Sequence, residues 1–223
     1  LFRSISILLN LFEEHLDHYN SYQEYIDAKV NIFRFQNEND YFIYNIDNQD
    51  VINNLTGIKS QPYTFSLINS NGNNHLYLDK DYIYINKNNE KISLFDINEP
   101  RNLIGKHNLN NIMAALAVAN ILNLDINKVV SSIKTFDTLP HRLENIGIYN
   151  DVTYYDDSIS TIPESCIGAL ETIENVDTII LGGKDRGIDY SKLINYLKNR
   201  KELNIICMPD TGHKIVDSLP DNI

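Results

Sequence analysis

In the first half of the chain, short apolar runs alternate with segments whose apolar residues have helical spacing. This pattern predicts strands followed by helices. Residues 5–11 form an apolar run that is typical of a buried strand. Residues 22–35 place five apolar side chains on one helical stripe, namely Tyr22, Tyr25, Ile26, Val30 and Phe33. The same reasoning predicts further elements, namely strands at 40–46 and 63–68, a short helix at 51–55, and a β-hairpin or meander over 76–95 turning at 86–89.

The second half begins with two helical segments and then changes pattern. We predict an alanine-rich helix over 112–122 and a second helix over 126–136, capped by Asp125 or Asn127. Pro140 breaks the pattern, so we expect a boundary near residue 137 between domains of residues 1–137 and 138–223. The order beyond it is β-β-α-β-α-β-α with the later strands parallel, which makes the fold class α/β.

Composition narrows the classes of function. The 223 residues are 43% hydrophobic and carry a net charge of −11, which argues against sequence-independent binding to nucleic acid or anionic lipid. The two cysteines are far apart and no signal peptide or membrane span is present, so we expect a cytoplasmic setting with reduced thiols. Because the chain starts at Leu1 rather than Met and stops just after a helical stretch, we expect a fragment of a longer protein.

Polar side chains gather between residues 139 and 164. His141 and Arg142 follow Pro140, and a short alternating run ends in Asp156, Asp157 and a hydroxyl cluster that includes Ser158 and Thr161. Residues 161–164 fit a capping box, so a helix is expected to start there. A helix N-terminus beside an arginine can bind a phosphate or a carboxylate. An ordinary capped helix with turn-forming residues fits the same pattern.

Two positions near the N-terminus are candidates for metal chemistry. His15 lies among carboxylates just past the first predicted strand, which is typical of a metal ligand and equally of a solvated acidic turn. Lys29 falls on the apolar stripe of the predicted helix over 22–35. It is therefore either snorkelling or partly desolvated, and a desolvated amine is open to covalent modification.

Two further segments offer ligand-binding groups. Asn108 and Asn111 share one face at the start of the alanine-rich helix, where paired amides can recognise adenine or simply cap the helix. Gly182 and Gly183 follow a buried strand and precede Lys184 and Arg186. Such glycines allow close approach of a ligand, and they also form ordinary turns.

Five segments together resemble the Mur ligases, in the family's order. NLFEEHLDHYNSYQEYIDAK (Asn10–Lys29) resembles its strand–DHLD–helix–Lys segment, and GKHNLNNIMAA (Gly105–Ala115) its GxHNxxNxxAA segment. LPHRLE, DDSIST and GGKDRGIDY resemble three motifs of its C-terminal domain. The resemblance implies the remainder of a central ATPase domain followed by a Rossmann-like α/β domain that binds glutamate.

The resemblance also implies an activity and residue roles. The branch most like this chain uses ATP and Mg²⁺ to add glutamate, D-glutamate being favoured, to UDP-N-acetylmuramoyl-L-alanine through an acyl phosphate, in peptidoglycan synthesis. A monomer that binds neither nucleic acid nor membrane is expected. The implied roles are these: metal binding for His15 and for Lys29 once carbamylated; nucleotide binding for Asn108, Asn111, Arg142 and Asp157; catalysis for Lys29 and Arg142; and amino-acid binding for Ser158, Thr161 and Arg186.

Three departures from the family pattern keep alternatives open. The phosphate-binding GxxxxGK(S/T) loop is absent, so the 223-residue piece alone is expected to be inactive. Ile159 stands where the family has a lysine that helps to bind the glutamate carboxylate, and Arg186 replaces another lysine. The alternatives are an L-glutamate-adding ligase, a related ligase such as a folylpolyglutamate synthase, and a non-catalytic nucleotide-binding relative. A hinge for domain closure is expected near Leu139 and Pro140.

Overall fold

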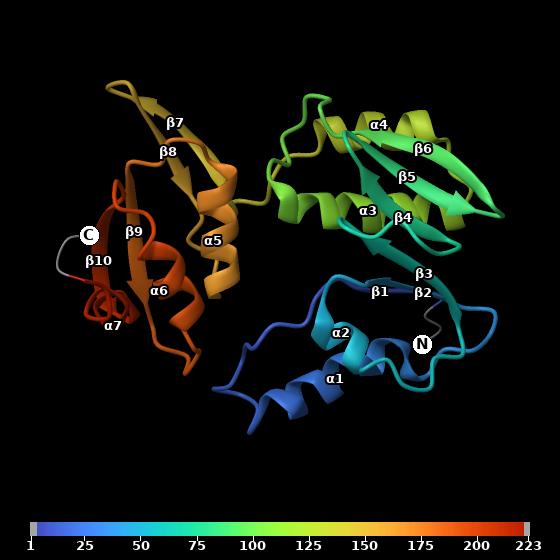
Figure 1. Ribbon diagram of the computed structural model, residues 1–223, viewed down its shortest axis with the longest axis horizontal. Coiled ribbons are helices and arrows are strands. Elements are labelled where there is room, and N and C mark those ends of the chain that lie inside the picture. The colour runs from blue at the N-terminus through green and yellow to red at the C-terminus, as the bar shows by residue number, and fades with distance from the viewer. Residues whose placement is uncertain (1–3, 221–223) are drawn as a thin grey trace. The chain divides into compact units, whose positions relative to one another are not determined.

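The computed structural model describes residues 4–220, which form two compact units (Figure 1). The first unit contains residues 4–12 and 21–137, and the second contains residues 13–20 and 138–220. The chain passes from the first unit to the second after Asp137.

A six-stranded sheet forms the centre of the first unit. Its strands lie in sequence order: β1 (Ile5–Leu8), β2 (Tyr41–Asn45), β3 (Gln61–Ser66), β4 (His75–Asp79), β5 (Tyr82–Lys87) and β6 (Glu90–Asp96). The first four strands pair in parallel, and β4, β5 and β6 form an antiparallel meander. The meander predicted over 76–95 is confirmed, and its second turn is narrower than expected, at Asn88 and Asn89, which both have positive φ.

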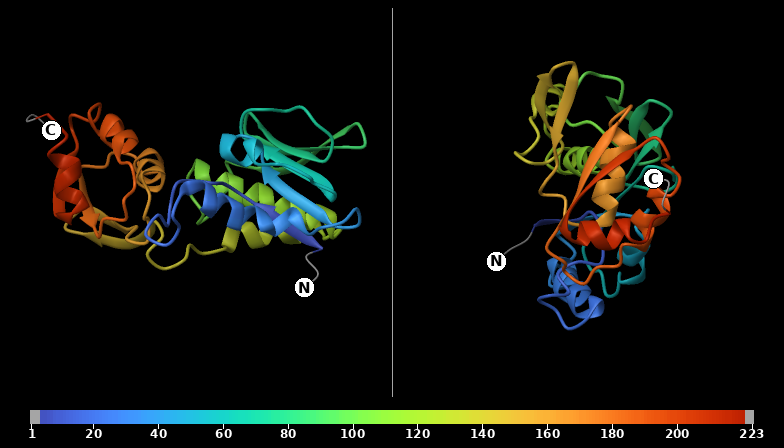
Figure 2. Two further views of the ribbon diagram at one scale, coloured as in Figure 1. Left: turned by 90° about the horizontal axis from the view of Figure 1, so that it is seen from below. Right: turned by 90° about the vertical axis from the view of Figure 1, so that its left-hand side faces the viewer.

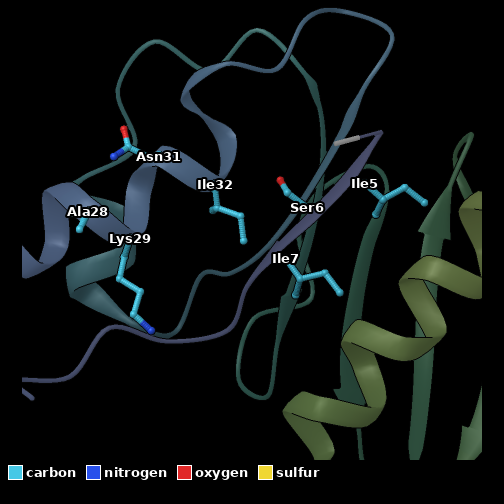
Figure 3. A pocket seen from close by; sticks show the side chains of 7 residues that line it. All are labelled: Ile5, Ser6, Ile7, Ala28, Lys29, Asn31 and Ile32. Atoms are coloured by element: carbon cyan, nitrogen blue, oxygen red, sulfur yellow. The ribbon is translucent and has the colours of Figure 1, made fainter. Parts of the chain in front are cut away.

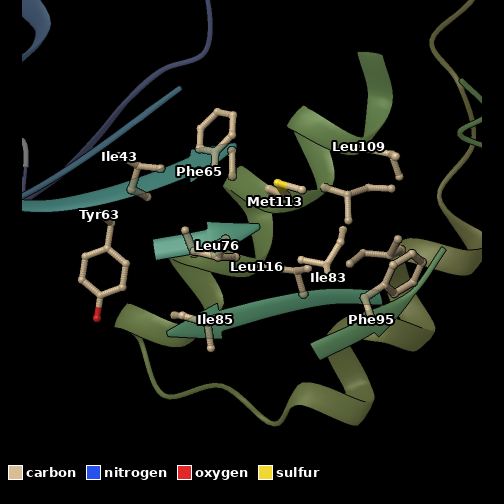
Figure 4. Close-up of a cluster of buried hydrophobic side chains, with 14 residues drawn as sticks. Ile43, Tyr63, Phe65, Leu76, Ile83, Ile85, Phe95, Leu109, Met113 and Leu116 are labelled. Carbon is tan, nitrogen blue, oxygen red and sulfur yellow. The ribbon is translucent and has the colours of Figure 1, made fainter. Parts of the chain in front are cut away.

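Helices cover both faces of this sheet (Figure 2). They are α1 (Tyr22–Arg34), α2 (Gln49–Asn53), α3 (Lys106–Ile121) and α4 (Ile126–Thr135). Neighbouring residues of β2 point to opposite faces, so Phe42 packs with α1 and α2 while Ile43 packs with α3. Figure 4 shows the larger core, in which side chains from β2 to β6 meet Leu109, Met113 and Leu116 of α3.

The strand predicted over 5–11 is wrong at its C-terminal end. β1 stops at Leu8, although Leu11 is only 1% exposed. The reason is Asn48, whose amide nitrogen donates to the Leu11 carbonyl at 3.1 Å and whose oxygen accepts the Leu11 N–H at 3.4 Å. The same oxygen caps α2 by accepting the Val51 N–H at 2.9 Å. Leu11 therefore enters the core without pairing as a strand.

The second unit holds two small sheets and three helices. An antiparallel hairpin joins β7 (Glu144–Tyr149) to β8 (Val152–Asp156), and β9 (Thr178–Gly183) pairs in parallel with β10 (Asn204–Asp210). The helices are α5 (Pro163–Thr172), α6 (Ser191–Leu197) and α7 (Thr211–Val216). Their core is a cluster of Leu170, Leu181, Leu193, Leu197, Leu203 and Ile215. The predicted order β-β-α-β-α-β-α, with parallel later strands, is confirmed.

The predicted capping box at residues 161–164 is wrong. The N-cap of α5 is Ile162, which has no side chain that can accept a hydrogen bond, and Pro163 occupies the first turn. The Thr161 side chain is directed to Glu14, to which it donates at 2.7 Å, and Thr161 precedes the N-cap position. Proline at this position needs no acceptor for its own nitrogen, so the helix starts without a side-chain cap.

Two features predicted from composition agree with the structure. Cys166 and Cys207 are both free thiols. Among residues 4–220, no helix has both the length and the apolar character needed to cross a lipid bilayer.

Candidate functional site

Arg142 lies at the tip of a tight turn in the second unit. The residues on either side of it have left-handed backbone conformations, with φ of 62° at His141 and 47° at Leu143. Arg142 N–H donates to the Leu139 carbonyl at 3.1 Å. The guanidinium is aimed toward the loop after β8, where it donates to Ser160 Oγ at 3.4 Å.

Asp157 connects that loop to the turn. One carboxylate oxygen accepts the Leu143 N–H at 2.9 Å, and the other accepts the Ser160 hydroxyl at 2.6 Å. Arg142 and Asp157, which the resemblance assigns to the nucleotide, therefore meet through Ser160. Ser160 was not among the predicted site residues, because nothing in a run of hydroxyl residues distinguishes the one that faces an arginine.

His141 and Asp156 form an ion pair at the base of the same turn. His141 Nδ1 and Asp156 Oδ2 are 2.8 Å apart, and Asp156 Oδ1 also accepts the Ser158 N–H at 2.9 Å. The hydrogen bond from His141 lowers the pKa of the Asp156 carboxyl to about 2, and the same contact raises the pKa of the His141 imidazole. The contact therefore favours the charged form of both groups.

A third cluster joins His15 to Thr161. Glu14 accepts the Thr161 hydroxyl at 2.7 Å through one oxygen, and its other oxygen lies 3.6 Å from His15 Nε2. His15 itself has a φ of 61°, so its backbone is also in the left-handed region. The structure thus brings together two predicted site residues that are separated by more than a hundred positions in the sequence. Glu14, which joins them, was not singled out.

The side chains at His15 supply one oxygen ligand and one nitrogen ligand, whereas a hard cation such as Mg²⁺ prefers oxygen. Mg²⁺ prefers oxygen ligands and usually retains waters, taking one or two carboxylates from the protein. Glu14 supplies a carboxylate and His15 a neutral nitrogen, which is compatible with such a site. Among the described residues, the group of three ligand-type side chains within 4.8 Å of one another is a different one: His141, Glu144 and Asp156.

The loop that follows β9 carries Arg186. Gly182 has a φ of 144°, and a Cβ on it would lie 2.6 Å from the Met208 carbonyl oxygen, so glycine is required there. Asp185 pairs with Lys214 of α7, and this contact lowers the pKa of the Asp185 carboxyl. Arg186 is half-buried beside this pair. Gly182 is thus explained by close packing of β9 on β10, whereas a Cβ on Gly183 would meet no atom within 4 Å.

Asn108 and Asn111 lie in the first two turns of α3, in the first unit. The helix starts at Lys106 with Gly105 as its N-cap, so the expectation of capping by an asparagine is wrong. Asn108 is 8% exposed; its amide donates to the Ile104 carbonyl at 2.7 Å, and its oxygen accepts from Asn111 at 3.0 Å. The pair is therefore ordered, with the exposed Asn111 facing outward.

Lys29 is exposed on α1, which favours the snorkelling interpretation over the desolvated one. Its ammonium lies 5.2 Å from the centre of the Tyr25 ring. The lysine also lines an open hollow of about 580 Å³ between α1 and β1 (Figure 3), together with Ile5, Ser6, Ile7, Ala28, Asn31 and Ile32. The amine is thus accessible to solvent and to small reactants.

Comparison with known proteins identifies the family. The family model described as the Mur ligase middle domain matches residues 3–119, which are 117 of the 223 residues. The chain belongs to the Mur ligase family.

Curated relatives extend the similarity to the second unit. The chain is 34% identical over 215 residues to a UDP-N-acetylmuramoylalanine–D-glutamate ligase of Oceanobacillus iheyensis, covering 96% of this chain and 46% of the relative. It is 36% identical over 196 residues to the ligase of the same name from Citrifermentans bemidjiense, covering 88% of this chain and 43% of the relative. The chain therefore spans less than half the length of these relatives.

A solved structure shows the same fold at lower identity. The MurF ligase of Thermotoga maritima, solved in complex with ADP, matches with a TM-score of 0.68 and 15% identity. The match covers 99% of this chain and 52% of that one. The predicted α/β fold class, with a central and a C-terminal Mur ligase domain, is thereby confirmed.

Proposed function

We propose that this chain is part of an ATP-dependent ligase that joins D-glutamate to UDP-N-acetylmuramoyl-L-alanine in peptidoglycan synthesis. The observation that carries the proposal is the 34% identity, over 96% of the chain, to a relative of that name. The first unit corresponds in this proposal to the remainder of the ATP-binding domain and the second to the glutamate-binding domain. Both thiols are free, so we place the reaction in the cytoplasm.

The reaction has two steps. The terminal carboxylate of the acceptor takes the γ-phosphoryl group of ATP, giving an acyl phosphate and ADP. The amine of glutamate then attacks the acyl carbon, and phosphate leaves with the bond electrons while the amine loses a proton. Both steps concentrate negative charge on phosphoryl oxygens, so fixed positive groups matter more than a protein nucleophile.

Arg142 is the residue that we assign to this charge. Its guanidinium can donate two parallel hydrogen bonds to phosphoryl oxygens, and its contact with Ser160 is long enough, at 3.4 Å, to be exchanged for a phosphate. Asp157 holds the turn and the Ser160 hydroxyl, and we assign its remaining acceptor capacity to the ribose hydroxyls. Asn108 and Asn111 are assigned to the adenine edge.

Magnesium ions would neutralise the phosphates when bound. We assign His15 and Glu14 to one ion, since an imidazole and a carboxylate lie 3.6 Å apart there. Lys29 is assigned to a second ion after carbamylation, in which its amine adds carbon dioxide, loses a proton and gains carboxylate oxygens. Its exposed position on α1 is compatible with that modification.

The incoming amino acid is assigned to the second unit. Ser158 and Thr161 supply hydroxyl groups, and Arg186 supplies a positive charge for a carboxylate. Ile159 lies between these hydroxyl residues, 49% exposed and apolar, so it cannot pair with a carboxylate. This specific difference supports a second candidate, a ligase of the same reaction that accepts L-glutamate.

The test uses the full-length gene product that contains this chain. Ligation of UDP-N-acetylmuramoyl-L-alanine is followed by ADP release and by the mass of the product, with D-glutamate and L-glutamate assayed side by side. The expected result is ATP-dependent product with D-glutamate. Product with L-glutamate alone replaces the main proposal with the second candidate, and product with neither, although ATP binds, supports a non-catalytic relative.

A matched pair of variants connects that activity to the site. Arg142→Ala should lower kcat/KM by about a hundredfold, the usual cost of removing one charged group that stabilises a transition state. Lys192→Ala breaks an exposed 3.0 Å ion pair with Glu164 elsewhere in the second unit and should change kcat/KM by less than about twofold. Equal activity of the two variants would contradict the role assigned to Arg142.

A further inference from the structure

The backbone around Arg142 is held in an unfavourable conformation. His141 and Leu143 both have positive φ; histidine adopts this region more readily than most residues, whereas a leucine there is uncommon and strained. Such conformations persist only where the surroundings over-determine them, and they are concentrated at functional sites. The structure should therefore contain contacts that hold the turn in place.

Those contacts come from both sides of Arg142. On the N-terminal side, His141 Nδ1 pairs with Asp156 at 2.8 Å, and His141 N–H donates to Glu144 Oε2 at 2.7 Å. On the C-terminal side, Leu143 N–H donates to Asp157 at 2.9 Å. The last residue of β8 and the residue after it thus hold the two neighbours of one arginine.

The direction of Arg142 depends on this turn rather than on its own contacts. The guanidinium is a long, flexible group, and its 3.4 Å hydrogen bond with Ser160 is at the weak end of the range. A rotation of the backbone at His141 would swing the whole side chain. On the N-terminal side, the contact of the His141 imidazole with Asp156 opposes this rotation together with the hydrogen bond from the His141 N–H to Glu144.

We propose that His141 and Asp156 are positioning residues that orient Arg142 toward the nucleotide phosphates. The proposal rests on the function assigned above, because it gives Arg142 a phosphate to meet. Neither side chain needs to touch the substrate. Asp156 is fixed in turn by the Ser158 N–H, which donates to its other oxygen at 2.9 Å, so the pair is anchored to the loop after β8.

A cation site at the same group of side chains is not supported. His141 Nδ1, Asp156 Oδ2 and Glu144 Oε2 are each committed to a hydrogen bond that holds the turn. An ion bound by these three atoms would replace those bonds and release the strained backbone. The hydrogen bonds therefore explain the cluster without a metal.

Two substitutions remove the contact between His141 and Asp156 without adding backbone strain. His141→Gly keeps the bonds made by the His141 N–H and carbonyl and suits a φ of 62°, so it removes only the imidazole. Asp156→Asn keeps the acceptor for Ser158 but removes the negative charge. Lys192→Ala is the control, because it breaks an exposed ion pair of the same unit at a similar distance.

The experiment measures KM for ATP, kcat and the urea midpoint of the full-length protein and these variants. His141→Gly and Asp156→Asn should each raise KM for ATP by about tenfold, as expected for a misdirected charged hydrogen bond. The urea midpoint of His141→Gly should change little, because relief of the positive φ offsets the loss of the exposed ion pair, and KM for glutamate should be unchanged. Lys192→Ala should leave both KM values within about twofold of wild type.

A double-mutant cycle tests whether the pair acts through Arg142. In an Arg142→Lys background, His141→Gly should have little further effect on KM for ATP, because there is no guanidinium left to orient. Full additivity of the two substitutions would overturn the proposal. So would a wild-type KM for ATP in His141→Gly, and in either case the ligase function itself would stand.

Failure of the proposed function is detected separately. If the wild-type protein makes no product, calorimetry measures the affinity of the wild type and the same variants for ADP. These affinities then test whether His141 and Asp156 position Arg142. Weaker ADP binding by His141→Gly than by Lys192→Ala would support the positioning role in a non-catalytic protein. Equal affinities, or no ADP binding by the wild type, would overturn it.

Discussion

The two units hold their candidate site residues in different ways. In the first unit, Asn108 and Asn111 lie on a regular helix, and their hydrogen bonds join residues only three or four positions apart. In the second unit, Arg142 lies on a strained turn that combines short-range hydrogen bonds with others that join residues fourteen or more positions apart. The two asparagines are thus positioned by a regular helix, and Arg142 is positioned by a network of hydrogen bonds.

This difference predicts where each unit is sensitive. The helix of the first unit is supported by a large core under the sheet, so single polar changes on it should affect binding but not folding. The turn of the second unit is held by the buried side chain of Leu143, 5% exposed, and by its polar contacts. Changes there should affect geometry and binding together.

The largest expected effect is on the core of the first unit. Leu116 of α3 is 0% exposed and packs against the sheet, so Leu116→Ala should cost about 2–5 kcal/mol in free energy of unfolding. Urea unfolding of the full-length protein measures this cost. Leu122→Ala, at the 54% exposed C-cap of the same helix, should cost less than about 1 kcal/mol. Equal costs would mean that this core does not support α3.

The next effect concerns Asp157. Asp157→Ala releases the Leu143 N–H and the Ser160 hydroxyl together, so kcat/KM for ligation should fall by about a hundredfold. Asp157→Asn keeps an acceptor for Leu143 and should lose less than about tenfold. Steady-state kinetics of the full-length protein distinguishes the two. If both variants lost the same activity, the charge of Asp157 and not its hold on the turn would be responsible.

A smaller effect is expected on α3. Asn108→Ala removes the acceptor for Asn111 and the donor to Ile104, and should raise KM for ATP by about tenfold. Asn110→Ala is its control, because among the described residues Asn110 Oδ1 is buried without a hydrogen-bond partner. Removing an unsatisfied group costs little. A KM change in Asn110→Ala as large as in Asn108→Ala would contradict the assignment.

The same contrast explains what could be predicted from the sequence. The alternating strands and amphipathic helices of both units depend on local periodicity, and their order was predicted correctly. The extent of β1 was not, because Asn48 ends it from a position 37 residues beyond Leu11. The start of α5 was not, because Ile162 takes the N-cap position and the side chain of Thr161 is directed to Glu14, far away in the sequence.

The candidate site residues show the same difference between local spacing and contacts of distant segments. Asn108, Asn111 and Lys29 could be singled out from spacing on a single helix. The contacts of Thr161 with Glu14, and of His141 with Asp156, join distant segments that no periodicity relates. Only the fold brings these side chains together. The roles that the resemblance gives them remain predictions until the variants above are measured.

The smallest expected effect is on the pH dependence of stability. The pKa of His141 is raised by Asp156, so its contribution is present below about pH 6.5 and is lost as pH rises through the raised value. The pKa of Asp156 is lowered to about 2, so its contribution is present above its ordinary value of 3.8 and is lost as pH falls toward 2. The pair therefore stabilises the fold most between these two limits.

Urea midpoints of the wild type and Asp156→Asn should thus differ most near about pH 5 and converge toward about pH 9. Glu144, whose carboxylate also faces His141, remains in both proteins and cannot produce the difference. Lys192→Ala, which leaves the contact between His141 and Asp156 intact, should shift the midpoint equally at both pH values. A difference that grew as the pH rose would show that the imidazole is neutral in the folded turn, and that a hydrogen bond without charge holds Arg142.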